Sequence, residues 1–499
     1  MKPRPSETKT FTVNSKLLCT FLIGVFLVSA ITLTSFINEQ SLAIRGKGGR
    51  MKTIVHLDLK GAPPKLSYLS QFFKLLSNLE VDGVLVEYED MFPYSGDLAV
   101  TSAPNHYSVD DIHKLNSLAQ ENGLEVIPLV QTFGHLEFVL KLDQFKYLRE
   151  NPTANNTICP SEPKSLELIN DMIRQIRELH PNSSTIHLGA DEAYHVAEDQ
   201  RCKEALHQRF NESVDELKLS HISNVANLGK KNGFSRILVW NDMFGSVPGD
   251  LLANYSLGEL VEPVVWGYAV DVTVPGYFPE HMLREYSKVF SSIIFGSAFK
   301  GANGIDQTFS EIQRYMANLG SYHQLQRLNP NYLANRVDTV ILTGWQRFWH
   351  GSPLCELLPV GIPSLIHELV YIKEWDDATP RIDRKLINTV LKCKKTPPSG
   401  PVEYHGNIFH PPIEWNFLDC DFPGIKIYKL VEKLRFVRWK AALSAPGDED
   451  LKRELLALKN EFQESLSEVF FDDAVQEFIN QNLEPLLNPP TQPPLVTQL

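Results

Sequence analysis

The feature that most constrains the fold is an alternation of short apolar runs with segments of helical spacing, which repeats from residue 53 to residue 372. Apolar runs of this length between helical segments are typical of buried parallel strands. The runs lie at residues 53–59, 83–88, 124–130, 184–190, 237–240, 264–266, 293–296 and 339–345. Eight strand–helix units in succession predict an α/β fold, a (β/α)8 TIM barrel, over residues 53–372.

The composition changes after the predicted barrel. Residues 373–424 include a stretch rich in Lys, Pro and Gly at 392–401, and we expect a linker or loop region there. Helical spacing returns over residues 425–487, where two or three helices are expected to pack against the barrel. The Pro-rich residues 488–499 predict a disordered tail.

The N-terminal end carries a candidate membrane anchor. Residues 1–16 form a basic tail, residues 17–37 contain no charge, and residues 38–52 form a short basic stem. An uncharged run of this length can span a bilayer as a helix, so the sequence predicts a single-pass membrane protein with a transmembrane signal anchor. A cleaved signal peptide is the alternative, with small residues at 41–43 as its cleavage site.

Four sequons for N-linked glycosylation favour a lumenal or extracellular catalytic part, and hence a glycoprotein. They begin at Asn155, Asn182, Asn211 and Asn254. Met51 leaves a second localisation open. Translation from it would remove the anchor and give a product of the cytoplasm and nucleus.

Composition and motifs exclude several classes of protein. The net charge of −12 argues against a nucleic-acid-binding protein, which normally has a basic surface. None of the six cysteines forms a Cys-x-x-Cys pair, so no zinc ribbon is expected and the redox compartment stays open. The sequence also lacks the motifs of zinc metalloproteases, α/β-hydrolases and phosphate-binding loops, and we expect neither a metal nor a cofactor.

The fourth apolar run ends in two adjacent carboxylates, Asp191 and Glu192. Side chains alternate along a strand, so His187 and Asp191 share a face that would point into the barrel mouth. The C-terminal ends of barrel strands form the catalytic face. An isolated Asp-Glu pair is more often a solvated helix N-terminus, but the run His-x-Gly-x-Asp-Glu at a strand end is much more specific.

Other strand ends add aromatic and polar candidates. Three of the seven tryptophans, Trp240, Trp266 and Trp345, lie at the ends of apolar runs. Each alone is equally well explained by core packing, but three on one face favour a sugar pocket, in which rings pack against sugar C–H faces. The accompanying polar candidates are Asp58, Lys60, His135, His187, Asp242 and Tyr268.

The run His187–Glu192 resembles the signature of family 20 glycoside hydrolases, the β-N-acetylhexosaminidases. Residues 239–244, Gly134-His135 and Gly344-Trp345 are similar to further motifs of that family, and the resemblance covers residues 53–372. Within the family the chain is most similar to a divergent vertebrate branch. The resemblance implies action on terminal N-acetylgalactosaminides and N-acetylglucosaminides.

The resemblance also implies a retaining, substrate-assisted mechanism. Glu192 would protonate the glycosidic oxygen, and the substrate's own 2-acetamido oxygen would attack the anomeric carbon to form an oxazolinium. Asp191, kept ionised, would orient the acetamido group and raise the pKa of Glu192. His135 would hydrogen-bond within the network of the acid. The implied substrate-binding residues are His135, His187, Trp240, Asp242, Trp266, Tyr268, Trp345, Asp58 and Lys60.

Three departures from the family pattern concern sugar selectivity and turnover. Lys60 stands near the position where the family has an arginine, and Gln131 replaces an aspartate. The tyrosine expected after the seventh strand is absent from residues 297–300, and Tyr268 is a candidate substitute.

The leading hypothesis is therefore an exo-β-N-acetylhexosaminidase, and the alternative is a lectin-like barrel that binds sugar with weak catalysis. A structural membrane scaffold would leave the rim chemistry unexplained. Retention of both Asp191 and Glu192 favours the enzyme, because a binding site needs only one carboxylate. The expected partners are a terminal N-acetylhexosaminide and, through the anchor, a membrane. The natural glycan, the pH optimum and the oligomeric state, including a homodimer, stay open.

Overall fold

A computed structural model describes residues 50–377, 380, 382–394, 404–405, 408–409, 417–445 and 447–488. The chain divides into two compact units, Met1–Arg50 and Met51–Leu499. The predicted tail 1–16 and anchor 17–37, and the predicted C-terminal tail 488–499 except Asn488, lie outside the described residues. All that follows concerns the unit Met51–Leu499.

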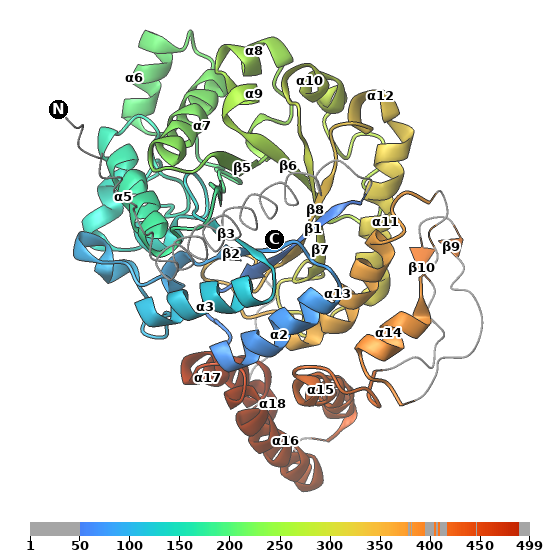
Figure 1. Cartoon of the computed structure of the whole chain (residues 1–499). Coiled ribbons are helices and arrows are strands. Elements are labelled where there is room, and N and C mark those ends of the chain that lie inside the picture. Colours follow the sequence, from blue (N-terminus) through green and yellow to red (C-terminus); the bar gives the residue numbers. More distant parts are fainter. Residues whose placement is uncertain are drawn as a thin grey trace, which may run out of the picture. The chain divides into compact units, whose positions relative to one another are not determined.

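Eight parallel strands close into a barrel in which each strand pairs with its sequence neighbours and β8 pairs with β1 (Figure 1). The strands are β1 Lys52–Asp58, β2 Gly83–Glu87, β3 Glu125–Leu129, β4 Thr185–His187, β5 Arg236–Trp240, β6 Glu262–Trp266, β7 Ile294–Lys300 and β8 Thr339–Gly344. The predicted (β/α)8 barrel is confirmed.

Helices surround the barrel strands and follow them in sequence (Figure 1). They are α2 Leu66–Asn78, α3 Val109–Glu121, α4 Glu137–Leu140, α5 Pro163–Leu179, α6 Gln200–Arg209, α7 Val214–Lys231, α8 Gly249–Asn254, α9 Leu257–Leu260, α10 Met282–Val289, α11 Ile312–Leu328, α12 Pro330–Leu333 and α13 Leu358–Ile372. The expected capping box before α3 is confirmed, because Ser108 and Asp111 exchange side-chain-to-backbone hydrogen bonds.

The hydrophobic core has two layers that follow from the alternation of side chains along each strand. Leu85, Ile127 and Val264 fill the barrel interior, together with equivalent residues of the other strands. Ile186 and Leu188 of the fourth strand region belong to the larger cluster between strands and helices. A packed interior leaves the carboxyl ends of the strands as the place for a site.

Two strands differ from their predicted bounds by three residues or more at one end. β4 ends at His187 because Gly189 and Ala190 take left-handed backbone conformations, with φ of 59° and 67°. β7 continues to Lys300, with a register shift between Ala298 and Lys300. The hydropathy pattern of the sequence predicts neither the early end of β4 nor the extension of β7.

The C-terminal helices, α15 Ile425–Leu443, α16 Glu449–Ser467, α17 Asp472–Asn482 and α18 Glu484–Leu487, pack against the barrel. Lys65, at the start of α2, donates its backbone N–H to Val469 O at 2.6 Å and its ammonium group to Ser467 O at 2.7 Å. Arg347, after β8, forms a bidentate ion pair with Glu477 of α17 at 2.6 Å. The helical region expected after the barrel is therefore confirmed.

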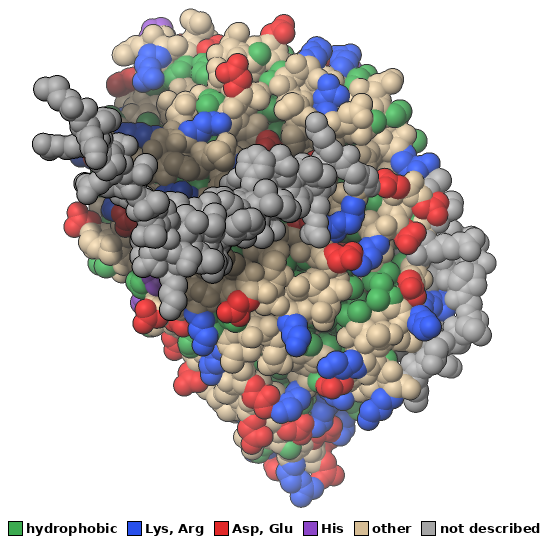
Figure 2. Space-filling model, in the orientation of Figure 1, with side chains coloured by type: hydrophobic (Ala, Val, Ile, Leu, Met, Phe, Trp, Pro, Cys, Tyr) green, Lys and Arg blue, Asp and Glu red, His purple; other side chains and the backbone are tan. Residues whose placement is uncertain are grey.

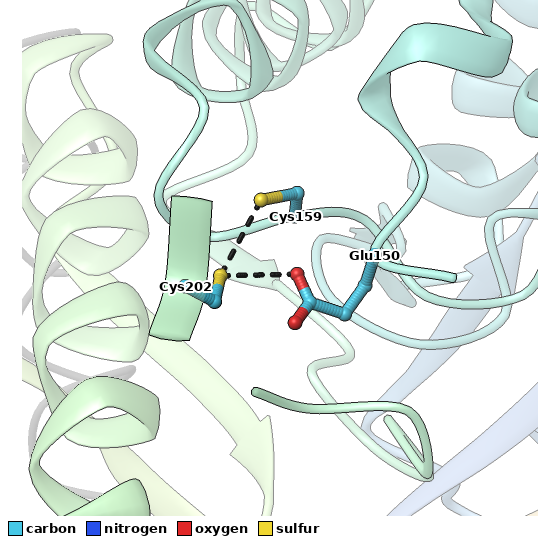
Figure 3. A group of neighbouring side chains, drawn as sticks. All are labelled: Glu150, Cys159 and Cys202. Carbon is cyan, nitrogen blue, oxygen red and sulfur yellow. Dashed lines mark hydrogen bonds between the residues drawn. The ribbon is translucent and has the colours of Figure 1, made fainter. Parts of the chain in front are cut away.

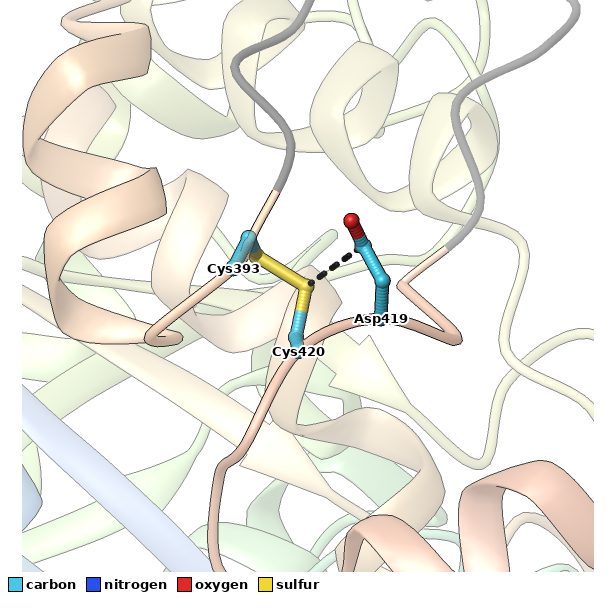
Figure 4. The surroundings of a disulfide bond; sticks show 3 residues. All are labelled: Cys393, Asp419 and Cys420. Atoms are coloured by element: carbon cyan, nitrogen blue, oxygen red, sulfur yellow. Dashed lines mark hydrogen bonds between the residues drawn. A yellow bond between two sulfur atoms is a disulfide. The ribbon is translucent and has the colours of Figure 1, made fainter.

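The segment between α13 and α15 is more structured than a linker. It contains α14 Arg384–Val390 and the short antiparallel strands β9 Tyr404–His405 and β10 Ile408–Phe409. A disulfide joins Cys393 to Cys420, and the Asp419 carboxylate lies 3.7 Å from the Cys420 sulfur (Figure 4). The disulfide ties the chain after α14 to the chain before α15.

The predicted localisation as a single-pass membrane protein is wrong, because none of the helices among the described residues is both long enough and apolar enough to cross a membrane. The most apolar of the barrel helices, α13, has 15 residues, whereas a span needs about 20. The longest helices, α15 and α16, carry charged side chains in every turn.

Charges of both signs are interspersed on the face of the molecule in Figure 2, including the C-terminal helices at its lower end. Lys433 pairs with Glu461 and Lys426 with Glu468 across α15 and α16.

Candidate active site

A cavity of about 420 Å³ opens at the carboxyl ends of the barrel strands. The ends of β2 to β8, or the loops that follow them, contribute residues to its wall. The loop after β1 contributes Lys60. The lining residues are Lys60, Glu87, Gln131, His135, Asp191, Glu192, Trp240, Trp266, Tyr268, Ala269, Tyr277, Gly301, Ala302, Arg314, Trp345, Arg347 and Phe348. Eight of the eleven predicted site residues lie in this wall.

The loop after β4 presents Asp191 and Glu192 through an unusual backbone path. Ala190 and Glu192 have φ of 67° and 47°, and His135 on the facing loop has φ of 54°. Non-glycine residues in this region are strained by about 1–3 kcal/mol each and are held there by their surroundings. Gly134 lets the two loops touch, because a Cβ at this position would collide with the Asp191 carbonyl oxygen.

His135 connects the two carboxylates. Its Nε2 lies 3.1 Å from Glu192 Oε2 and 3.4 Å from Asp191 Oδ2. Burial alone would lower the pKa of His135, but Asp191 and Glu192 outweigh it and raise that pKa to about 10. The imidazole is therefore protonated and charged at neutral pH.

The two carboxylates differ in their environment. Asp191 is 5% exposed, and its Oδ1 has no hydrogen-bond partner among the described residues. Burial raises the pKa of Asp191 to about 8, with Asp242 and Glu192 adding to the shift and His135 opposing it. Burial also favours the neutral form of Glu192, but hydrogen bonds from His135 and Tyr194 lower its pKa overall.

These directions reverse those that the resemblance implies, which are an ionised Asp191 and a raised pKa for Glu192. The reason is positional. Glu192 is partly exposed and lies nearer to the His135 imidazolium, whereas Asp191 is buried with one oxygen unbonded. The single proton of the pair therefore rests on Asp191 in this arrangement.

Asp242 positions the acid rather than facing the cavity. Its Oδ2 accepts the backbone N–H of Glu192 at 2.9 Å, and its Oδ1 accepts the indole N–H of Trp266 at 3.1 Å. One side chain thus fixes both a carboxylate residue and an aromatic wall residue.

Four aromatic rings form a continuous wall. Ring centroids lie 5.9 Å apart for Trp240 and Trp345, 6.4 Å for Tyr268 and Trp345, and 5.4 Å for Trp266 and Tyr268. The Tyr268 hydroxyl and the Trp345 indole N–H are buried beside each other, with Thr343 near the hydroxyl, and within the part of the chain that the structure describes neither makes a hydrogen bond of normal geometry. Buried polar groups without partners in a cavity wall are suited to a polar ligand.

Lys60 lies in a buried ionic cluster. Its ammonium group is 3.1 Å from Asp58, 3.4 Å from Glu87 and 3.7 Å from Glu89. Burial opposes the charge on Lys60, but the surrounding carboxylates raise its pKa well above the usual value. Burial likewise opposes ionisation of Glu87, yet Lys60 and a hydrogen bond from His56 hold its pKa below the usual range.

The remaining predicted residues lie below or behind the cavity. His187 is fully buried under the wall, its ring centroid is 4.3 Å from that of Trp240, and it accepts the Gly189 N–H. Burial lowers the pKa of His187 to about 3, so the ring is neutral. Asp58 accepts the N–H groups of Lys60 and Gln346 and does not line the cavity.

Several wall residues were absent from the predicted set. Glu87 is the last residue of β2, Gln131 lies two residues after β3, and a 3.1 Å hydrogen bond joins their side chains, so their place at strand ends could have identified them. Arg314, Tyr277 and Phe348 come from the start of α11 and from loops, and no sequence signal identifies them.

One cluster at the rim has the residue types of a metal site. His350 lies 3.0 Å from Glu89 and 3.5 Å from Asp90. Two lysines already supply positive charge there, because Lys141 Nζ lies 2.8 Å from His350 Nε2 and Lys60 lies 3.7 Å from Glu89. The cluster is consistent with ion pairing and requires no metal.

Comparison with known proteins decides the family. Residues 77–259 match the model described as glycosyl hydrolase family 20, catalytic domain. Hexosaminidase D of Homo sapiens is 37% identical over 456 residues, which cover 87% of this chain and 92% of that protein. The chain belongs to glycosyl hydrolase family 20. Hexosaminidase D of Bos taurus is 44% identical over 314 residues, 62% of this chain and 89% of that protein.

Membership of family 20 confirms the prediction of a glycoside hydrolase of the β-N-acetylhexosaminidase type, and hexosaminidase D is the divergent vertebrate branch that the motifs indicate. Among solved structures, a β-N-acetylhexosaminidase from Bacteroides fragilis is similar with a TM-score of 0.47 and 14% identity, over 78% of this chain and 71% of that one.

Proposed function

We propose that this family 20 chain is a retaining exo-β-N-acetylhexosaminidase, which removes terminal N-acetylgalactosamine or N-acetylglucosamine from glycoconjugates by substrate-assisted catalysis. One observation carries the proposal. A buried carboxylate with an unbonded oxygen, Asp191, lies beside the partly exposed Glu192 in an aromatic-walled cavity. These are the groups that a 2-acetamido nucleophile and a proton donor require.

The size of the cavity supports action on a terminal sugar. Its volume of about 420 Å³ is at the small end of the range for ligand sites, roughly 300–1,000 Å³. The ring wall of Trp240, Trp266 and Trp345 would pack against one sugar ring. Tyr277 and Phe348 line the same cavity and are 39% exposed each, which suits contact with the leaving group at its mouth.

The acetamido group of the sugar would form hydrogen bonds with two polar groups of the cavity wall, one on Asp191 and one on Tyr268. Its N–H would donate to Asp191 Oδ1, and its carbonyl oxygen would accept from the Tyr268 hydroxyl. Tyr268 would thus take the part of the tyrosine missing after β7, where Lys300 instead donates to the Trp345 carbonyl at 2.7 Å. Held in this way, the acetamido oxygen would attack the anomeric carbon.

Substrate binding would also set the protonation states. An N–H donated to Asp191 favours its ionised form, so the proton of the pair would pass to Glu192. Glu192 would give that proton to the glycosidic oxygen as the bond to the anomeric carbon breaks, and Asp191 would stabilise the positive oxazolinium. Glu192, now ionised, would take a proton from water, which opens the oxazolinium with retention of configuration.

The opposite wall would hold the sugar hydroxyls. Lys60 offers a charged donor, Glu87 an acceptor and Gln131 an acceptor oxygen with no partner among the described residues. Lys60 would serve where the family has an arginine, as a point charge without the forked geometry of a guanidinium. Every group in this account comes from one chain, so a homodimer has no part in it.

The lectin-like alternative is separated from the enzyme by matched variants of the full chain. We expect hydrolysis of aryl N-acetyl-β-galactosaminide or N-acetyl-β-glucosaminide to fall about 10²–10⁴-fold in Glu192→Gln and in Asp191→Asn, because each loses a group used in proton transfer or charge stabilisation. Binding of the free sugar, measured by calorimetry, should persist in Glu192→Gln. Sugar binding by a wild-type protein that hydrolyses neither substrate would favour the lectin.

A further inference from the structure

Two free cysteines face each other outside the active site. Cys159 lies before α5 and Cys202 in the first turn of α6, and their sulfur atoms are 3.4 Å apart (Figure 3). Both residues are fully buried. They are 43 positions apart in sequence, and the residues between them include α5, β4 and both carboxylates of the candidate active site.

A buried glutamate is the third member of the cluster. The Cys202 thiol donates to Glu150 Oε2 at 3.0 Å, and in Figure 3 dashed lines join the Cys202 sulfur to both this carboxylate and the Cys159 thiol. Glu150 Oε1 accepts the backbone N–H groups of Glu198 and Asp199 at 2.8 Å and 3.1 Å. Those residues end the loop of residues 188–199 that carries Asp191 and Glu192, here called the acid loop, so the cluster holds the far end of the acid loop.

We propose that Cys159 and Cys202 form a reversible disulfide that fastens α6, and with it the end of the acid loop, to the chain before α5. The sulfur atoms need to approach by about 1.4 Å to reach bonding distance. The bond would close a loop around the catalytic carboxylates. This proposal is independent of the proposed function, since it is tested by covalent linkage.

Packing or metal binding explains the cluster less well. Cys202 packs with Ala205 and Leu206, as a small apolar residue would, but packing does not account for a buried carboxylate that accepts from its thiol. A structural zinc ion takes four ligands, and the described residues bring together three here. One oxygen of Glu150 is already used by two backbone N–H groups.

Hydrogen peroxide is the oxidant for which the chemistry balances within the cluster. Glu150 would take the Cys202 proton while the Cys202 sulfur attacks one peroxide oxygen, which gives a sulfenic acid and releases the other oxygen as water after protonation. The Cys159 sulfur would then attack the Cys202 sulfur and expel the second oxygen as water with the Cys159 proton. Two thiols and one peroxide thus give one disulfide and two waters.

Local opening of α6 would admit the oxidant. The helix has ten residues, of which only Cys202, Ala205 and Leu206 are buried. A helix with so few buried apolar contacts opens at low free energy. Closing the disulfide would remove this opening and hold the acid loop at its C-terminal end.

Peptide mapping of the full-length wild-type protein tests the linkage. The protein is reduced, freed of reductant, exposed to hydrogen peroxide, alkylated under denaturing conditions and digested with trypsin. We expect the peptide of residues 150–164 linked to the peptide that begins at Cys202, while Cys355, a buried cysteine without a thiol neighbour among the described residues, stays alkylated. Alkylation of both Cys159 and Cys202 after peroxide, or sulfinic acid on either without linkage, would overturn the proposal.

Thermal unfolding of variants gives a second readout. Oxidation should raise the Tm by several degrees more in the wild type and in Cys355→Ser than in Cys159→Ser or Cys202→Ser. The comparison between variants is needed because the Cys393–Cys420 disulfide responds to the same reagents. An equal rise in all four proteins, or stoichiometric zinc that is lost in Cys202→Ser, would contradict a disulfide.

Discussion

At the scale of single residues, burial and the position of one histidine decide where the proton of the catalytic pair resides. Asp191 is buried with an unbonded oxygen, and Glu192 is nearer to the charged His135. In the free site the proton therefore resides on Asp191, the residue that we propose binds the acetamido group. Substrate binding, rather than the fold alone, would move it to the acid.

The alkaline limb of the pH profile follows from this arrangement. The active state carries one proton on the pair Asp191 and Glu192, and the pKa of Asp191 is about 8 because of burial. As pH rises through about 8, that proton is lost and kcat/KM should fall, while His135, with a pKa of about 10, stays charged. The pKa of Glu192 lies below its usual value, so a second proton binds only in acid. Initial rates from pH 4 to 10 check this, and a kcat/KM that does not fall by pH 10 would contradict it.

Tyr268 gives a residue-scale test of acetamido binding. Its hydroxyl lies near Thr343 and Trp345 but makes no hydrogen bond of normal geometry among the described residues, so Tyr268→Phe should change the Tm little. The loss of one hydrogen bond to substrate, about 1.4 kcal/mol, should lower kcat/KM about 10-fold.

Tyr107→Phe is the matched control for Tyr268→Phe. Its buried hydroxyl donates to Pro64 O at 2.5 Å, away from the cavity, so its removal should cost about 1–3 kcal/mol of stability and spare kcat/KM. An unchanged kcat/KM in Tyr268→Phe would remove this tyrosine from the account.

At the scale of elements, contact between two loops fixes the position of Asp191 and Glu192. The loops after β3 and β4 touch at Gly134, where a side chain would collide with the backbone of Asp191 and Glu192. Gly134→Ala should therefore displace the acid loop, and a displacement of about 1 Å can cost about 10²-fold in rate. Steady-state kinetics together with circular dichroism would show lost activity in a folded protein.

Gly320→Ala is the control for that loop variant. Gly320 lies within α11, where the nearest atom to an added Cβ is the Tyr371 hydroxyl at 3.7 Å. Alanine is favoured over glycine in a helix by about 0.5–1 kcal/mol, so stability should rise or stay equal with full activity. Equal activity in both alanine variants would mean that the loop contact does not position the acid.

The strands could be predicted because their apolar runs have the length of buried parallel strands. The site could be predicted where a residue ends such a run or follows it closely, as Trp240, Trp345 and Asp191 do. Arg314 and Phe348 reach the cavity from a helix start and a loop, and their place depends on packing that no local pattern reports. In the free site the pKa shifts of Asp191 and Glu192 run opposite to the predicted ones, because they depend on burial and on distances to His135.

At the scale of the whole molecule, the C-terminal helices contribute to the site from a distance. Arg347 lines the cavity, and Glu477 of α17 holds its guanidinium through two bonds of 2.6 Å. The Gln481 side chain of the same helix accepts the backbone N–H of Leu354, in the loop after β8. The barrel and the helical region therefore act as one folded body around the cavity.

The central claim is that the acetamido oxygen of the substrate is the nucleophile. It is tested most directly by the hydrolysis rates of aryl N-acetyl-β-glucosaminides, or galactosaminides, that carry zero, one, two or three fluorine atoms on the acetyl methyl group. Fluorine withdraws electrons from the carbonyl oxygen, so kcat/KM should fall steeply and monotonically along the series. Rates that stay level across the series would contradict substrate assistance and require a nucleophile from the protein.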